Sequence, residues 1–275
     1  MRAPGPLAYR EYAPSAALAG AVQCYWTITG CTTGSLVNRV LPDGCADILL
    51  DFAAPVTAVG RVDGRRTVAV GTMRRAIVAP LSGGVDLFGI RFHPAGAAPV
   101  FGVPLNELTD RAQPLDDLLP GAGAGLEARL ADTADVATRI RHTERFLLER
   151  LRERRRPHPL VAAAVQLLRE QRGGGPVAGL GYTLGIGERQ LQRQFHAAVG
   201  IAPKQLARVL RLQHAVRLLG QQRPSSWSAL ALTAGYYDQA HLIREFKALA
   251  GVTPRAFAAE RQQVGFVQDG ERAGA

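Results

Sequence analysis

Lysine is nearly absent from this 275-residue chain, and so are the patterns that would assign it to a membrane or to the cell exterior. No stretch approaches the roughly 18 apolar residues of a membrane span. No basic segment followed by an apolar run opens the chain, so we expect no signal peptide. The three cysteines, Cys24, Cys31 and Cys45, are odd in number and lack CxxC spacing. They predict reduced thiols in a cytoplasmic protein.

Patterns that would indicate an enzyme are also missing. A metal-dependent barrel of the cupin type needs paired histidines near a glutamate, but His93, His142 and His158 are isolated and no HxH occurs. The aspartates of the 43–51 segment have no visible partner base. We therefore predict no catalytic residue, no metal site and no cofactor. A reactive thiol or soft-metal site formed by the three cysteines is an alternative, although buried cysteine is commoner in strands.

The net charge of +10 is unevenly distributed along the chain. Residues 157–275 hold 14 basic and 7 acidic side chains, whereas residues 1–156 hold 19 and 16. A basic surface attracts a polyanion and releases its counterions, so the C-terminal half is a candidate for nucleic-acid binding. The alternative is compositional, because heavy use of Ala, Arg and Gly is also what a GC-rich genome produces.

One five-residue pattern occurs twice in this basic half. Leu191-Gln192-Arg193-Gln194-Phe195 recurs 51 residues later as Leu242-Ile243-Arg244-Glu245-Phe246. Each copy is followed by a glycine and a proline, again 51 residues apart: Gly200 and Gly251, Pro203 and Pro254. Leu and Phe four apart share one helix face, and the Arg between them points away from it. The repeat indicates one supersecondary unit used twice, as in a pair of recognition helices.

The N-terminal half has the pattern of short β-strands followed by helices. Strand-like runs lie at 23–29, 46–52, 67–70 and 85–92, separated by the turn sequences Pro42-Asp43-Gly44 and Ser82-Gly83-Gly84. This predicts a small barrel or sandwich, but the sequence does not give the order of its strands. From Pro94 the spacing becomes helical, with helices expected at 126–130 and 137–155. Pro157-His158-Pro159 ends the second of these helices.

Helix ends are readable in the C-terminal half. Helices are expected over 160–171, 188–199 and 203–219, with Gly220 after the last of them. Ser226 and Asp238 are predicted to cap the next two helices, and Thr253-Pro254 opens the final one. Two helix-turn-helix units joined by the 203–219 helix explain this order.

The predicted fold class is therefore α+β, with an N-terminal β barrel or sandwich and an all-α C-terminal domain. We place the first domain at 1–156, with a β core over about 1–95 and helices over about 96–156. The double helix-turn-helix domain is expected at 158–263. Residues 264–275 are expected to form a disordered tail.

The second unit contains a long characteristic sequence. It runs from Ser228-Ala229-Leu230-Ala231 through Ala234-Gly235-Tyr236-Tyr237-Asp238-Gln239-Ala240-His241-Leu242 to Arg244-Glu245-Phe246-Lys247, Gly251, Thr253 and Pro254. These residues match the C-terminal signature of the AraC/XylS family of bacterial transcription regulators, which residues 158–260 as a whole resemble. The first unit matches more loosely, through Leu184-Gly185, Glu188-Arg189-Gln190-Leu191 and Arg193-Gln194-Phe195. It has Gly181, Gly187 and Ala202 where the family has Ala, Ser and Ser.

The N-terminal half carries a second resemblance. Leu41-Pro42-Asp43-Gly44-Cys45-Ala46-Asp47-Ile48-Leu49, Gly89-Ile90-Arg91-Phe92-His93-Pro94 and the stretch 105–119 resemble a sensor domain found in a subset of these regulators. The resemblance implies an architecture and names no ligand.

The family resemblance also implies which side chains face DNA. The base-reading positions would be Arg189, Gln192, Arg193, Gln239, His241 and Arg244. Arginine can pair bidentately with guanine, and glutamine with adenine. Phosphate contact by Arg193 and Arg244, and plain solvation of Gln192 and His241, are open alternatives. The expected phosphate contacts are Lys204, Arg208 and Arg211.

The sequence thus predicts a sequence-specific, ligand-responsive transcription regulator. Its expected partners are duplex DNA, RNA polymerase, a small-molecule effector of unknown site and a second copy of the chain, with no membrane. The resemblance implies activation, but no residue pattern fixes the direction of control, the operator or the effector. A DNA-binding regulator without an effector, and a thiol sensor, metal sensor or enzyme in the N-terminal barrel, are the alternatives.

Self-association is expected to use the 137–155 helix. Its apolar stripe (Ile140, Leu147, Leu148 and Leu151) is flanked by a run of charges, which suits helix pairing. The alternative is that the stripe packs against the chain's own β domain or its 160–168 helix.

Overall fold

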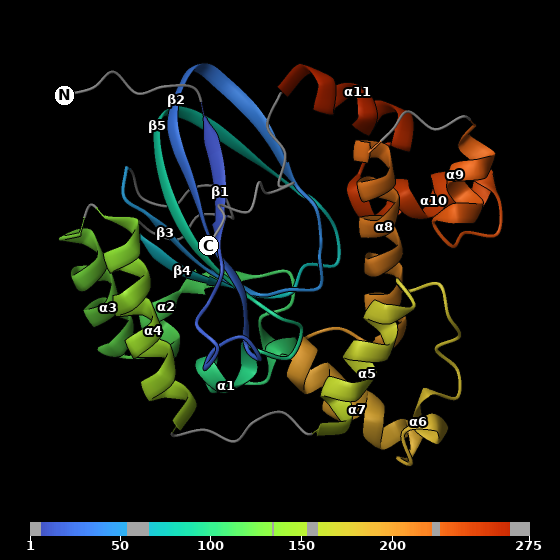
Figure 1. The fold of residues 1–275 in the computed structure, drawn as a ribbon, viewed down its shortest axis with the longest axis horizontal. Helices are drawn as coiled ribbons and strands as arrows, with labels where there is room; N and C mark the ends of the chain where they lie inside the picture. The colour runs from blue at the N-terminus through green and yellow to red at the C-terminus, as the bar shows by residue number, and fades with distance from the viewer. Residues whose placement is uncertain (1–6, 54–65, 134, 153–158, 222–225, 265–275) are drawn as a thin grey trace.

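A six-stranded antiparallel sheet forms the centre of the N-terminal half (Figure 1). The computed structural model describes residues 7–53, 66–133, 135–152, 159–221 and 226–264. The sheet order is β1-β2-β5-β3-β4-β6. The strands are β1 (Ala8–Tyr12), β2 (Val22–Val40), β3 (Asp47–Asp51), β4 (Thr67–Val70), β5 (Ile77–Phe92) and β6 (Ala112–Pro114).

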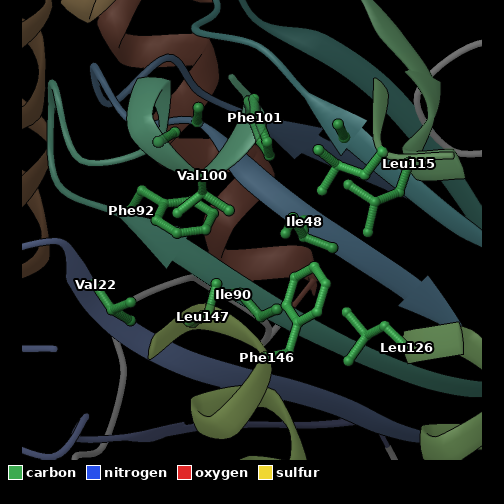
Figure 2. Packing of buried hydrophobic residues seen from close by; sticks show 14 of the residues in the cluster. Val22, Ile48, Ile90, Phe92, Val100, Phe101, Leu115, Leu126, Phe146 and Leu147 are labelled. Carbon is green, nitrogen blue, oxygen red and sulfur yellow. The ribbon is translucent and has the colours of Figure 1, made fainter. Parts of the chain in front are cut away.

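One face of the sheet is covered by helices. These are α1 (Ala98–Phe101), η1 (Leu105–Glu107), α2 (Leu115–Leu118), α3 (Ala122–Ala131) and α4 (Val136–Arg152). Figure 2 shows the core between the layers, where Ile48 and Ile90 of the sheet meet Phe101, Leu126 and Phe146 of the helices. All five side chains are buried. Burying these large apolar groups is the main stabilising contribution in this half.

The opposite face of the sheet carries a second apolar cluster. Its buried members are Cys24, Trp26, Ile28, Leu49, Val68, Val70, Leu81 and Leu87. Alternating side chains of a strand point to opposite faces, so the central strands supply both clusters. Val68 and Ala69, for example, are both fully buried but belong to different clusters.

The C-terminal half is all helical. It contains α5 (Pro159–Glu170), α6 (Leu180–Thr183), α7 (Glu188–Val199), α8 (Pro203–Gln221), α9 (Trp227–Thr233), α10 (Gln239–Ala250) and α11 (Pro254–Val264). The long helix α8 contributes to two separate cores: Leu206 and Ala207 pack with α5 and α7, while Leu212 and Ala215 pack with α9 and α10. Figure 1 shows α7 and α10 at opposite ends of α8. These are the two predicted helix-turn-helix units.

The helix ends confirm the predicted caps of the second unit. Asp238 accepts a hydrogen bond from His241 N at 2.6 Å, and Ser226 Oγ accepts one from Ala229 N at 3.0 Å. Gly200 and Gly251 adopt the left-handed conformation with φ of 87° and 78°. Glycine has no Cβ, so it ends both helices without strain. Helix α8 continues two residues beyond the predicted end at 219 and includes Gly220.

The N-terminal strands differ from the prediction in length and number: β2 continues to Val40 and β5 begins at Ile77, beyond the predicted runs 23–29 and 85–92. Strands β1 and β6 were not predicted, and β6 lies in the segment expected to be helical. Both strands lie at the edges of the sheet, and β6 is only three residues long. Neither strand therefore shows the alternation of apolar and polar residues that marks a half-buried strand. The Ser82-Gly83-Gly84 segment is not a turn. It is an irregularity inside β5, where Gly83 has φ of 67° and the pairing with β2 shifts register.

The predicted dimer helix is α4, and much of its apolar stripe packs within its own half. Leu147 is fully buried in the core of the N-terminal half, and Ile140, Leu148 and Leu151 pack against the same core. This packing is what the alternative interpretation expected. Leu148 and Leu151 are only partly buried and line a depression, so self-association through α4 stays a prediction.

The two halves of the chain are in contact. Leu41 of the N-terminal half packs into the core of the second unit, and Ala95 packs into the core of the first. Gln213 on α8 donates a hydrogen bond to the Pro42 carbonyl at 2.7 Å. The predicted boundary at 156–158 and most of the predicted tail lie outside the described residues. No helix among the described residues is long and apolar enough to cross a membrane.

Candidate DNA interface and N-terminal cavity

Helix α7 exposes the three polar side chains expected to face DNA. Leu191 and Phe195 are buried in the core of the first unit, which fixes the orientation of the helix. Arg189, Gln192 and Arg193 are exposed. Their side chains project from a helix whose opposite face is anchored, so the structure brings these three predicted residues onto one surface.

Helix α10 repeats the arrangement at the other end of α8. Leu242 and Phe246 are fully buried, and Gln239 and Arg244 are exposed. Gln239 Oε1 accepts a hydrogen bond from Ser228 Oγ at 3.2 Å, across the turn between α9 and α10. The second unit therefore presents an arginine and a glutamine on its outer face.

His241 is less available for base recognition than its neighbours. Its Nδ1 accepts a hydrogen bond from Tyr237 N at 3.3 Å, and its Nε2 lies 3.9 Å from Glu245. The ring also packs edge-on against Tyr236, with 5.4 Å between centroids. These contacts orient His241 within the start of α10.

The three predicted phosphate contacts divide into two kinds. Lys204 is exposed near the start of α8. Arg208 Nε and Arg211 Nη2 instead pair with Glu245 on α10, at 2.7 Å and 3.2 Å. Arg211 also donates to the Gly173 carbonyl at 2.8 Å. The structure thus gives Arg208 and Arg211 an internal role, joining α8 to α10 and to the end of α5.

Glu245 is the centre of this ion-pair network. Burial acts to raise the pKa of Glu245, but hydrogen bonds and charges from Arg208 and Arg211 lower it below its usual value. Glu245 is therefore ionised at neutral pH and neutralises both arginines.

Each helix-turn-helix unit also exposes a tyrosine. Tyr182 on α6 is 92% exposed, and Tyr237, directly before the cap of α10, is 85% exposed. Leu232 on α9, the repeat equivalent of Tyr182, is also exposed. Large exposed apolar groups on a soluble surface often mark contact sites. Tyr237 belongs to the C-terminal family signature, but the sequence alone assigned it no role.

The N-terminal half contains a small cavity on the second face of the sheet. Its volume is about 70 Å³, and aliphatic and aromatic groups line most of it, including Tyr9, Trp26, Leu49 and Met73. Few polar side chains reach it; the charged ones are Asp47 and Arg91. A largely apolar cavity with a few convergent polar groups has the composition of a ligand site.

Arg91 holds the polar side of this cavity together. Its Nε lies 3.2 Å from Asp43 and 3.4 Å from Asp47, and Trp26 Nε1 donates to Asp47 at 3.1 Å. Burial raises the pKa of Asp47 to about 6, an effect that Arg91 opposes and Asp43 reinforces. A carboxyl perturbed in this way is a feature of functional sites. Sequence reasoning found both aspartates but missed Arg91, which comes from a distant strand.

The cysteines have the character of core residues. All three are free thiols, and Cys24 and Cys45 are buried. Burial raises the pKa of Cys24 to about 12 and that of Cys45 well above its usual value. Both thiols are therefore protonated at neutral pH, which disfavours nucleophilic or metal-binding roles. The described residues contain no cluster of three His, Cys, Asp or Glu side chains suited to a metal ion.

Comparison with known protein families decides what the double unit is. Residues 180–260 match the family described as "Helix-turn-helix domain", an AraC-type domain. Residues 180–260 are therefore an AraC-type helix-turn-helix domain. Residues 10–114 match a family described as "Domain of unknown function (DUF6597)". No curated protein matches the chain.

Several solved structures are similar to this chain. One is a transcriptional regulator with an AraC-type domain from Chromobacterium violaceum, with 28% identity, covering 38% of this chain and 94% of its own, at a TM-score of 0.35. The DNA-binding domain of AdpA, solved with a target DNA, has 25% identity, coverages of 38% and 93%, and a TM-score of 0.35. ToxT from Vibrio cholerae has 8% identity, coverages of 86% and 97%, and a TM-score of 0.45.

Proposed function

We propose that this regulator binds duplex DNA sequence-specifically, with α7 and α10 in successive major-groove segments of one DNA face. The repeated exposure of arginine supports this proposal most directly. Arg189, Arg193 and Arg244 are exposed, and among the described residues no ion pair with a carboxylate engages them. Guanidinium groups that are not committed to a carboxylate can pair bidentately with guanine or bind phosphate.

The side chains divide into three groups under this proposal. Arg189, Gln192, Arg193, Gln239 and Arg244 read base edges, and His241 contributes less because its ring nitrogens face its own chain. Lys204 binds phosphate. Arg208 and Arg211 position α10 through Glu245.

Anisotropy titrations of the full chain against operator and random duplexes test the reading role. We expect Arg189→Ala and Arg244→Ala each to weaken operator binding by roughly 1–3 kcal/mol and to weaken random-duplex binding much less. Arg145→Ala, an exposed arginine on α4, is the matched control and should change neither. Equal losses on both duplexes would reduce these arginines to phosphate contacts. Absence of salt-dependent binding to any duplex would refute the function.

The second part of the proposal is that a small, largely apolar effector binds in the cavity of the N-terminal sheet. Its walls supply apolar contact, and Asp47 and Arg91 supply a polar anchor. The perturbed carboxyl of Asp47 supports this choice over the two larger depressions, which lie between elements and lack such a buried ion pair.

A pair of substitutions on β5 tests the effector site. Ala79 is buried and lines the cavity, whereas its neighbour Val78 is exposed. Indole, benzyl alcohol and hexanoate are suitable probes, with thermal stability as the readout. We expect at least one probe to raise the melting temperature of the wild-type chain and of Val78→Phe, but not of Ala79→Phe. Binding that survives Ala79→Phe would place the site elsewhere, and no binding by any probe would favour a regulator without an effector.

A further inference from the structure

The segment between β4 and β5, residues 71–76, contacts the end of the first recognition helix. Thr72 Oγ1 donates a hydrogen bond to the Val199 carbonyl at 2.7 Å. Thr109, which follows η1, donates through Oγ1 to the Gly200 carbonyl at 2.6 Å. Thr72 is only 1% exposed, so water does not compete for its hydrogen bond.

The other end of the same segment contacts the second recognition helix. Ala76 N donates to the Leu249 carbonyl at 2.7 Å. Arg39 of β2 donates through Nη1 to the Ala250 carbonyl at 3.1 Å, and its Nε pairs with Glu260 on α11 at 2.9 Å. Segment 71–76 therefore joins the C-terminal ends of α7 and α10, with α8 as a second connection between them.

These contacts fall at the C-terminal end of each recognition helix, and one pair of acceptor carbonyls, Val199 and Ala250, is equivalent in the repeat. Val199 and Gly200 end α7, and Ala250 and Gly251 end α10, 51 residues later. Carbonyls at a helix C-terminus lack an intrahelical partner and accept hydrogen bonds from elsewhere. The glycines also leave room for the donors. A Cβ on Gly200 would lie 3.1 Å from Thr109 Oγ1, and one on Gly251 would lie 3.4 Å from Arg39 Nη1.

We propose that Arg39, Thr72, Ala76 and Thr109 form a clamp on both recognition helices and that this clamp sets the placement of α7 relative to α10. An element that controls the relative position of the two helices must bind both of them, and this clamp binds the C-terminal end of each. General packing between the halves, such as that of Leu41 and Ala95, would not need to select the terminal carbonyls of both recognition helices. Reading two groove segments about 34 Å apart depends on this placement.

The clamp is connected to the cavity through Met73. Met73 belongs to segment 71–76 and lines the cavity, as do the flanking residues Val70 and Ile77. The cavity volume of about 70 Å³ is well below the several hundred Å³ of most ligand pockets. A ligand of more than a few atoms must therefore displace a wall, and the unbranched Met73 side chain is the most adaptable one. This step rests on the proposed effector site: the ligand acts on DNA binding by moving a segment bonded to both recognition helices.

Spin-label distance measurements on the full chain test the clamp. Labels at Gln190→Cys and Ala240→Cys, exposed near the starts of α7 and α10, are placed in a Cys31→Ser background. We expect one narrow distance for the otherwise wild-type chain and a broader distribution when Thr72→Val and Thr109→Val are combined. Arg39→Gln, which acts on α10, should broaden it as well. Thr133→Val, which removes a threonine hydrogen bond at the end of α3, is the control and should leave it unchanged.

Two outcomes would overturn the clamp. One is an unchanged distribution in both clamp variants, and the other is equal broadening in the Thr133→Val control. Met73→Trp, which enlarges the wall, and Met73→Ala, which reduces it, should each shift the mean distance. If both variants fold, as judged by circular dichroism, and neither shifts the distance, the connection to the cavity is refuted. The clamp would then fix the two helices without responding to a ligand in the cavity.

DNA binding separates failure of the clamp from failure of the proposed function. We expect the wild-type chain to prefer operators with one spacing between the two recognition elements over operators with one base pair inserted. The clamp variants should reduce this preference about fivefold or more, the usual lower range of an allosteric coupling. A wild-type preference that all clamp variants retain refutes the clamp and leaves the DNA-binding function intact. No duplex binding by the wild-type chain refutes the function itself.

Discussion

The two helix-turn-helix units share one core pattern but differ in how their helices are fixed. In the second unit, side chains cap three helices: Ser226, Asp238 and Thr253 accept hydrogen bonds from Ala229 N, His241 N and Ala256 N. In the first unit, Gly187 and Ala202 stand at the positions equivalent to Asp238 and Thr253. Gly187 makes no side-chain cap, and the carboxylate of Glu188 instead accepts from Gly181 N at 3.0 Å.

The inner side of the recognition helices shows the same difference. Glu245 of the second unit pairs with Arg208 and Arg211. Its equivalent in the first unit is Gln194, whose buried Oε1 has no hydrogen-bond partner among the described residues. The comparison teaches that the Leu–Phe core pattern is sufficient for the fold, while local rigidity depends on polar side chains that only the second unit possesses. The first unit relies more on Thr72 and Thr109 of the N-terminal half.

Replacing Glu245 by glutamine, the residue found at the equivalent position 194 of the first unit, should change stability the most. Glu245→Gln removes the charge that neutralises two partly buried arginines, so we expect the free energy of unfolding to fall by about 2 kcal/mol. Chemical denaturation of the full chain measures this value. Gln194→Ala, the matched change in the first unit, should cost less because its carbonyl oxygen has no partner to lose. A larger loss from Gln194→Ala would reverse the comparison.

Acid should weaken the second unit before the first. The pKa of Glu245 is lowered from its unfolded value of 4.5. Such a carboxyl contributes stability that is fully present above pH 4.5 and is lost as the pH falls through its lower folded value. His241, Tyr236, Arg208 and Arg211 face this carboxylate, and its ion pairs with the two arginines are lost once it is protonated. Between pH 5 and 3, hydrogen exchange should accelerate more in α10 than in α7, and Glu245→Gln should abolish the difference.

Removing the aspartate cap should cost less than removing the ion pairs. Asp238→Ala leaves the His241 amide without its acceptor, and we expect a loss of about 1 kcal/mol with faster exchange in the first turn of α10. Gly187→Ala at the equivalent position removes no side-chain acceptor and serves as the control. A cost shared by both variants would show that the two caps are equivalent after all.

Adding a cap to the first unit should produce the smallest effect, and in the opposite direction. Gly187 has extended backbone angles, and a Cβ there would meet nothing within 4 Å. Gly187→Asp can therefore supply an acceptor and reduce the freedom of the unfolded chain, raising stability by about 0.5 kcal/mol. Denaturation measured beside Asp238→Ala would test whether the units become more alike. A loss of stability would contradict the assigned role of this position.

Local patterns were enough to predict the C-terminal half except for the short helix α6. The spacing of Leu191 and Phe195, the repeated glycines and the capping residues all act within a few residues of one another, so a sequence shows them directly. The same holds for the turn at Pro42-Asp43-Gly44, where Gly44 has φ of 83°. Strand β6 pairs with β4 across more than 40 residues and has no local signal of its own.

The features that join distant segments could not be read in this way. Arg91 meets Asp43 and Asp47 only because β5 lies beside β3 in the sheet. Arg208 and Arg211 are predicted phosphate contacts, and the sequence does not show that Glu245 lies across from them. The clamp donors, Thr72 and Thr109, carry no motif at all, since a threonine hydroxyl acquires its role from the carbonyl that the fold brings to it.

Selection of duplexes from a random library by the full chain tests the central claim most directly. The chain and its Arg193→Ala and Arg244→Ala variants should be used in parallel. Two recognition helices on one body predict two enriched sequence elements, about one helical turn apart. Arg193→Ala should relax the sequence of one element, and Arg244→Ala should relax the other. Enrichment of a single element that both variants alter alike, or no enrichment by the wild-type chain, would contradict the account.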